Sequence, residues 1–81
     1  MTVTVRLFAG ARDLAGTDSL QVELCDGATV GDLRRRLALA HPKLSRLLAR
    51  SSIAVRDEFA DDTLPLPAGA EVAVLPPVSG G

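Results

Sequence analysis

The chain has 81 residues, of which 47% are hydrophobic and only 2% aromatic, and its nine basic and ten acidic residues give a net charge of −1. This length allows one domain, whose core must be built from aliphatic side chains. The balanced charge argues against a protein that mainly binds a phosphate backbone, so we expect no nucleic-acid partner.

The first two predicted elements are strands. Residues 2–8 alternate, with Val3, Val5 and Leu7 on one face and Phe8 on the other. Residues 19–24 alternate in the same way, with Leu20, Val22 and Leu24 inward. The connector between them, residues 9–16, has the pattern of a helical turn that Gly16 closes.

The N-terminus therefore favours a strand over a signal peptide. No run approaches the roughly 20 apolar residues that a membrane helix needs. We expect a cytoplasmic protein without a membrane partner.

The main helix is predicted to start after Thr29, which is placed to cap it together with Asp32 in a capping box. Its buried stripe is expected to comprise Val30, Leu33, Leu37 and Ala40. Pro42 disfavours helical conformation at His41 and so ends the helix. Asp32 and Arg36 are spaced for an i,i+4 ion pair, and the run Arg34, Arg35 and Arg36 points in three directions, which indicates a structural role.

Leu39 does not fit the buried stripe of this helix. A short second helix within residues 43–50, with Leu44, Leu47 and Leu48 on one face, is placed to cover it. A binding partner is the alternative cover.

The rest of the chain predicts short strands. Ile53 and Val55 mark one, a turn leads to a weak strand at Phe59, and two prolines make residues 63–69 a loop. The last strand covers residues 70–75, with Val72 and Val74 inward. The order of elements predicts an α+β domain, residues 1–75, with one sheet covered on one face.

A tail of residues 76–81, Pro76-Pro77-Val78-Ser79-Gly80-Gly81, follows the last strand and would span roughly 20 Å when extended. Its prolines make the base stiff, whereas the two glycines have no side chain to obstruct a narrow channel. Gly81 leaves its α-carboxylate sterically open. A terminal Gly-Gly alone is more often a frayed end, but this whole string after a hydrophobic strand is more specific.

A carboxylate reacts only after its oxygen becomes a leaving group, as in adenylation by ATP, after which a sulfur nucleophile gives a thiocarboxylate. A protein that carries sulfur on its terminal carboxylate needs no catalytic side chain for these steps, and the sequence has no nucleophile–base pattern. Cys25 is the single cysteine and His41 the single histidine, so neither a disulfide nor a Cys-rich or His-cluster metal site is expected.

Three segments resemble the small, sulfur-carrier subunit of molybdopterin synthase: residues 5–16 (VRLFAGARDLAG), 29–33 (TVGDL) and 71–81 (EVAVLPPVSGG). The resemblance covers essentially the whole chain. It departs from the family where Arg56 stands in place of the common Asn, and at residues 68–70, where the family commonly has an acidic turn.

The resemblance implies a ubiquitin-like β-grasp fold, in which the first and last strands are parallel neighbours. It also implies that an adenylyltransferase of the ubiquitin-activating type consumes ATP to activate Gly81, that a sulfur donor protein loads it, and that no cofactor stays bound. The tail, with Gly80 threading the active site, would then enter the large subunit and give sulfur to cyclic pyranopterin monophosphate. The family suggests two carriers on a large-subunit dimer.

An exposed apolar patch is expected at the root of the tail. Phe8 and Leu75 fall on the outward phase of strands that the family places side by side, and Phe59 is a candidate to join them. Together with Pro76, Pro77, Val78 and Ser79, these residues are the predicted partner-binding residues.

Other functions remain open on sequence alone. One is a sulfur carrier for thiamin thiazole or cysteine synthesis, although residues 7–16 disfavour the thiamin type. Another is a ubiquitin-like modifier of lysines, and a third is an interaction module with an idle tail.

Overall fold

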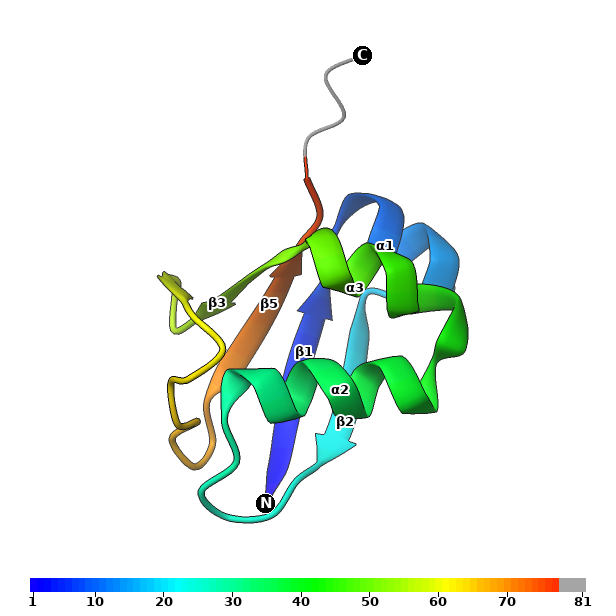
Figure 1. Ribbon diagram of the computed structural model, residues 1–81. Helices are drawn as coiled ribbons and strands as arrows, with labels where there is room; N and C mark the ends of the chain where they lie inside the picture. Colours follow the sequence, from blue (N-terminus) through cyan, green and yellow to red (C-terminus); the bar gives the residue numbers. More distant parts are fainter. Residues whose placement is uncertain (78–81) are drawn as a thin grey trace.

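A computed structural model describes residues 1–77, which form a five-stranded sheet with helices on one face (Figure 1). The strands are β1 (Thr2–Leu7), β2 (Ser19–Glu23), β3 (Ser52–Val55), β4 (Glu58–Ala60) and β5 (Glu71–Leu75). The helices are α1 (Ala9–Ala15), α2 (Val30–Ala40), the 3₁₀ turn η1 (Pro42–Leu44) and α3 (Ser45–Arg50). The α+β class is confirmed.

The strand order is β2-β1-β5-β3-β4, so the first and last strands lie side by side at the centre of the sheet. They run parallel, with Val5 opposite Val72 and Leu7 opposite Val74, whereas every other strand pair is antiparallel. The C-terminal ends of β1 and β5 therefore lie at the same end of the sheet, where residues 76–77 leave it (Figure 1).

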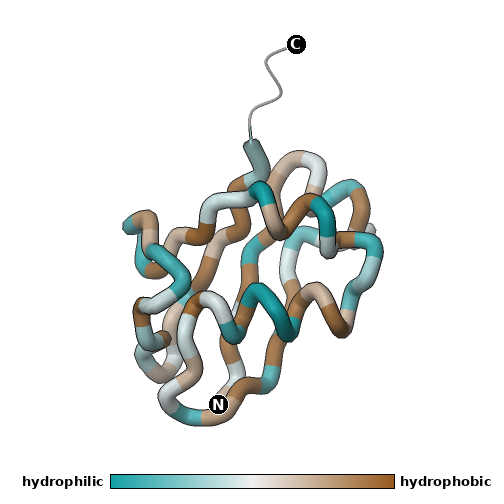
Figure 2. The backbone as a smooth tube through the Cα atoms, in the orientation of Figure 1, coloured by the Kyte–Doolittle hydropathy of each residue, from teal (hydrophilic) through white to brown (hydrophobic). Residues whose placement is uncertain are grey.

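The core lies between this sheet and the helices. The inward residues of β1 and β5 are fully buried, and α2 places Val30, Leu33 and Leu37 against them with 0% exposure. Figure 2 shows apolar residues concentrated along the central strands and a hydrophilic stretch in the middle of α2. Alternation in the strands and helical spacing in α2 thus specify the same core.

The predicted capping box at the start of α2 is confirmed. The Thr29 hydroxyl accepts a hydrogen bond from the Asp32 amide at 3.2 Å, and the Asp32 carboxylate accepts one from the Thr29 amide at 2.9 Å. Two amide groups that no helical carbonyl can reach are satisfied in this way.

Two details predicted for α2 are wrong. Ala40 is exposed: it lies within about 20° of Leu33 round the helix, but it is the last residue of α2. Asp32 pairs with Arg35, not Arg36: one carboxylate oxygen is held by Thr29 and the other accepts from the Arg35 guanidinium.

The connector between β1 and β2 forms the helix α1, longer than the single turn predicted, and Gly16 ends it at φ 74°. The second helical segment, η1 with α3, also forms and buries Leu44 and Leu48. It does not cover Leu39, which is 77% exposed. The interpretation that this segment covers Leu39 is therefore wrong.

The segment after β4 is a loop, as its prolines predict, and it is tied to the start of α2. The Val30 amide donates to the Leu64 carbonyl at 2.9 Å, and the Leu66 amide donates to the Ala28 carbonyl at 2.8 Å. Leu66, which belongs to this loop, is thereby buried in the core. Within residues 1–77, no helix is both long enough and apolar enough to cross a membrane.

Candidate functional site

The face of the sheet that carries no helix is crossed by a row of three apolar side chains with Arg6 at one end. Strand register aligns Arg6 with Ala73, Ala73 with Ala54, and Ala54 with Phe59. Residues opposite one another in a sheet point to the same face, so the four side chains lie in line. Phe59 stands at the outer end of this row and is 76% exposed.

A second row lies beside the first, nearer the end of β5. Leu75 is paired with Ser52 and is half-buried. Phe8 is one residue beyond the last β1–β5 pair and has extended backbone, φ −126° and ψ 157°, so the parallel register places it next to Leu75. Phe8 is 42% exposed. The outward orientation predicted for both residues is confirmed.

We call these residues the open-face patch: Phe8, Ala54, Phe59, Ala73 and Leu75. Ala54 and Ala73 lie between Phe59 and the Phe8–Leu75 pair. The sequence alone does not reveal this arrangement, because it depends on the β3–β4 and β3–β5 registers. Arg6 and Glu71, 4.0 Å apart, form an ion pair on the same face. An apolar centre with charges at its margin is typical of a protein-binding surface.

The patch adjoins the end of the described chain. Pro76 is half-buried and Pro77 is exposed directly after β5. Val78, Ser79, Gly80 and Gly81, the other predicted site residues of the tail, lie outside the described residues.

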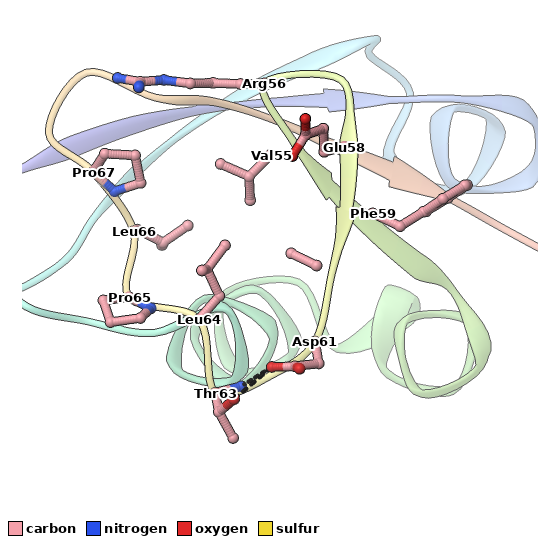
Figure 3. Close-up of a pocket in the computed structure, with 11 residues that line it drawn as sticks. Val55, Arg56, Glu58, Phe59, Asp61, Thr63, Leu64, Pro65, Leu66 and Pro67 are labelled. Carbon is pink, nitrogen blue, oxygen red and sulfur yellow. Dashed lines mark hydrogen bonds between the residues drawn. The ribbon is translucent and has the colours of Figure 1, made fainter.

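A hollow of about 810 Å³ lies between the β3–β4 hairpin and the loop before β5 (Figure 3). Val55, Leu64 and Leu66 point into it, whereas Phe59 points away (Figure 3). At its rim Asp61 accepts hydrogen bonds from the Thr63 hydroxyl and amide, which hold the pKa of that carboxyl below its usual range. The residues that line the hollow include no histidine, cysteine or lysine.

The other candidate side chains are also isolated. Cys25 is exposed and follows β2, and His41 is the residue that ends α2. Among residues 1–77, no group of three or more His, Cys, Asp or Glu side chains is placed to hold a metal ion. The most extended apolar surface named so far in the described part of the chain is therefore the open-face patch beside the end of β5.

Solved structures define the class of protein. The chain superposes on SAMP1 from Haloferax volcanii with a TM-score of 0.88 and 34% identity, covering 100% of both chains. It also superposes on a ubiquitin from Caldiarchaeum subterraneum with a TM-score of 0.68 and 20% identity, covering 100% of this chain and 98% of the other. The second likeness shows the fold alone. The protein is a ubiquitin-like β-grasp domain.

The sequence matches the ThiS family over residues 5–81, and the chain belongs to this family. It is 37% identical to the molybdopterin synthase sulfur carrier subunit of Chlamydomonas reinhardtii, over 100% of both chains. It also superposes on a chain in the complex of subunits 1 and 2 of molybdopterin-converting factor from Helicobacter pylori 26695, with a TM-score of 0.72, 27% identity and 100% coverage of both chains. The resemblance noted from sequence is confirmed.

Proposed function

We propose that this chain is the sulfur carrier subunit of a molybdopterin synthase and that the carboxylate of Gly81 is its reactive group. One observation carries the proposal: the open-face patch lies where β5 ends, directly before the segment that finishes in Gly80-Gly81. Family membership and the similarity to sulfur carrier subunits support the same function.

The proposed loading takes three steps and uses a separate adenylyltransferase. A Gly81 carboxylate oxygen attacks the α-phosphorus of ATP and pyrophosphate leaves. The outer sulfur of a persulfide on a donor protein then attacks the acyl adenylate, and AMP leaves with the oxygen. A thiol of the donor protein attacks the inner sulfur of the resulting acyl disulfide, so the donor is left as a disulfide and the Gly81 thiocarboxylate is released. In this proposal the chain supplies only the carboxylate, and the adenylyltransferase and the donor protein supply the other reacting groups.

The proposed delivery step takes place in the large subunit. The open-face patch docks on that subunit, Pro76 and Pro77 hold the base of the tail straight, and Gly80 passes through the narrowest part of the channel. The thiocarboxylate sulfur attacks cyclic pyranopterin monophosphate and forms a thioester that joins Gly81 to the pterin. Water then cleaves the acyl–sulfur bond, which leaves the sulfur on the pterin and restores the Gly81 carboxylate, and two such deliveries complete the dithiolene. The solved complex of subunits 1 and 2 from Helicobacter pylori supports a large subunit as the partner.

Intact mass spectrometry tests the reactive group. The protein is produced together with its large subunit, adenylyltransferase and sulfur donor, and we expect the mass increase of one oxygen-to-sulfur exchange at Gly81. A variant without Gly81 should show no increase and no molybdopterin formation. Molybdopterin synthesis by that variant at the normal rate would refute the proposal.

Docking through the open-face patch is tested by comparing substitutions at two equally exposed positions, one inside the patch and one outside it. Phe59 is 76% exposed and Leu39, on α2, is 77% exposed, so replacing either leaves the core intact. Phe59→Gln should weaken association with the large subunit at least about tenfold in a titration, whereas Leu39→Gln should not. Phe8→Gln should act like Phe59→Gln. Unchanged affinity of both patch variants would exclude this surface as the docking site.

A ubiquitin-like modifier is the second candidate, because the chain is 34% identical to small archaeal modifier protein 1 from Haloferax volcanii over 94% of this chain and 97% of that protein. The same activated Gly81 would then form an isopeptide bond with a lysine amine. Conjugates that survive a denaturing gel and disappear when Gly81 is deleted distinguish this function. A carrier for thiamin thiazole or cysteine synthesis would instead co-purify with a different synthase.

A further inference from the structure

Three basic side chains line one side of the helical segment formed by η1 and α3. Lys43, Arg46 and Arg50 are three and four residues apart, so they lie on the same side of this segment, over a length of about 10 Å. All three are exposed, whereas Leu44 and Leu48, on the other side of the segment, are buried in the core. We call Lys43, Arg46 and Arg50 the basic stripe.

The acidic side chains near the stripe do not balance its charge. Residues 42–52 include no Asp or Glu, and none of the ion pairs within the described residues 1–77 involves the stripe. α1 packs against the segment and carries one cation and one acid, Arg12 and Asp13. Asp18, an exposed residue, follows α1. Together with the stripe these residues amount to four cations and two acids, so the local charge is positive.

α2 also packs against the segment, and the acids on this side each have a cation of their own. The carboxylate of Asp32 is held by Arg35. Asp62 comes near α3 because Arg34, which donates to the Leu48 carbonyl, also donates to Asp62 at 3.1 Å. The uncompensated charge beside α3 is therefore positive, and an acidic surface complements it.

The basic stripe reaches the root of the tail. α3 crosses the end of the sheet at which residues 76–77 leave it (Figure 1). β3 begins at Ser52, which pairs with Leu75, the last residue of β5, and Arg50 lies two residues before Ser52. Phe8 and Leu75 of the open-face patch flank the same root on the other face of the sheet. The root thus has apolar residues on one side and a cation on the other.

This arrangement indicates which protein covers the stripe, and the inference rests on the proposed function, in which the tail enters the large subunit. A channel that admits an extended chain has walls on all sides, so its mouth meets both flanks of the root. A nucleic acid suits the stripe less well, because the whole chain has a net charge of −1 and the stripe has only three cations.

We propose that the basic stripe binds an acidic surface of the large subunit, beside the mouth of the channel that receives the tail. Arg50 contacts this surface next to the root, and Arg46 and Lys43 extend the contact along α3 and η1. Attraction between the two surfaces orients the chain before it docks, so it raises the association rate more than the residence time. The open-face patch then supplies the apolar part of the interface.

The test measures association of the full chain with the large subunit by stopped-flow fluorescence, at about 20 mM and about 500 mM salt. A variant that combines Arg46→Glu with Arg50→Glu should associate at least about tenfold more slowly at low salt. At high salt the difference should fall below about twofold, because ions screen exposed charges. Arg46→Lys combined with Arg50→Lys retains the charge and should retain the rate.

A matched control separates the stripe from net charge. Arg36 and Arg56 are exposed, lie outside η1 and α3, and form no ion pair within the described residues 1–77. Arg36→Glu combined with Arg56→Glu alters the net charge equally and should slow association less than about threefold. Far-UV circular dichroism of both glutamate variants should match that of the parent chain, since every substituted position is exposed.

Several results would overturn this inference. They are an unchanged or faster association of the Arg46→Glu and Arg50→Glu variant at low salt, or equal slowing by the control pair. Slower association with the adenylyltransferase alone would assign the stripe to that enzyme instead. Binding of a single-stranded RNA that this variant abolishes, with its association to the large subunit unchanged, would assign the stripe to nucleic acid.

Failure of this inference and failure of the proposed function give different results. A parent chain that does not bind the large subunit would refute both. A parent chain that binds it and supports molybdopterin formation, while reversal of the stripe leaves association unchanged, would refute this inference alone. Loading of sulfur on Gly81 in the stripe variant is followed separately by intact mass.

Discussion

Arg56 and Asp57 are the central residues of the β3–β4 turn, and both have positive φ, 51° and 67°. Val55 faces Glu58 across the hairpin, so the loop contains only these residues. A turn of this kind favours Asn or Gly at its first position, because other side chains are strained there. Arg56→Asn should raise the free energy of unfolding by about 0.5–1 kcal/mol, as measured by urea denaturation.

The control for this prediction is Arg56→Ala, which removes the charge but keeps the strained backbone. The free energy of unfolding of Arg56→Ala should stay close to that of the parent protein. An equal gain from both variants would show that the arginine charge, and not the backbone, determines the effect.

Asp32 gives the protein a predictable acid sensitivity. The Thr29 amide and the Arg35 guanidinium donate to its carboxylate and hold the pKa of Asp32 below its usual range. As pH falls, the unfolded chain therefore binds a proton at Asp32 before the folded protein does. The stabilisation from Asp32 is complete above the ordinary pKa of an aspartate, and it is lost as pH falls through the lower pKa of the folded protein. Unfolding measured below about pH 4 should show declining stability, with a shallower decline for Asp32→Asn. An equally steep decline in both proteins would exclude Asp32 as a contributor.

At the scale of whole elements, Arg34 connects three segments of the chain. Its guanidinium donates from Nε and Nη2 to Asp62 at 3.2 and 3.1 Å, and from Nη1 to the carbonyls of Leu48 and Ser51. Arg34→Ala would leave these carbonyls without this donor. We expect the free energy of unfolding to fall by about 1–3 kcal/mol in urea denaturation.

Arg34→Lys should recover only part of this loss, because one ammonium cannot reach all the acceptors that the planar guanidinium serves. Arg46→Ala, on the exposed side of α3, should remain within about 0.5 kcal/mol of the parent protein. If Arg34→Ala behaves like Arg46→Ala, the connection does not stabilise the fold.

Arg34 also shows where sequence reasoning reaches its limit. The capping box at Thr29 and the strand faces follow from local spacing, and they were predictable. The partners of Arg34 lie 14, 17 and 28 residues away along the chain, so no local pattern indicates them. Phe59 belongs to the open-face patch for a similar reason, because only the register with Ala54 reveals its place.

At the scale of the whole molecule, the buried core and the open-face patch proposed to bind a partner lie on opposite faces of the sheet. The helices cover one face of the sheet and bury the core, and the other face carries the open-face patch beside the end of β5. Among residues 1–77 the buried core ends at Val74. Surface residues of the patch can therefore vary with the partner at little cost to the fold.

This separation predicts the effect of removing residues 78–81. The truncated protein should unfold within about 2 °C of the full chain in a thermal scan, because the interactions of the described core are retained. It should still bind the large subunit through the open-face patch, although more weakly because the tail contacts are lost. Molybdopterin formation should stop completely, and unreacted truncated protein should inhibit the full chain by competing for the same subunit. A truncated protein that binds but does not compete would show that the patch and the tail engage different partners.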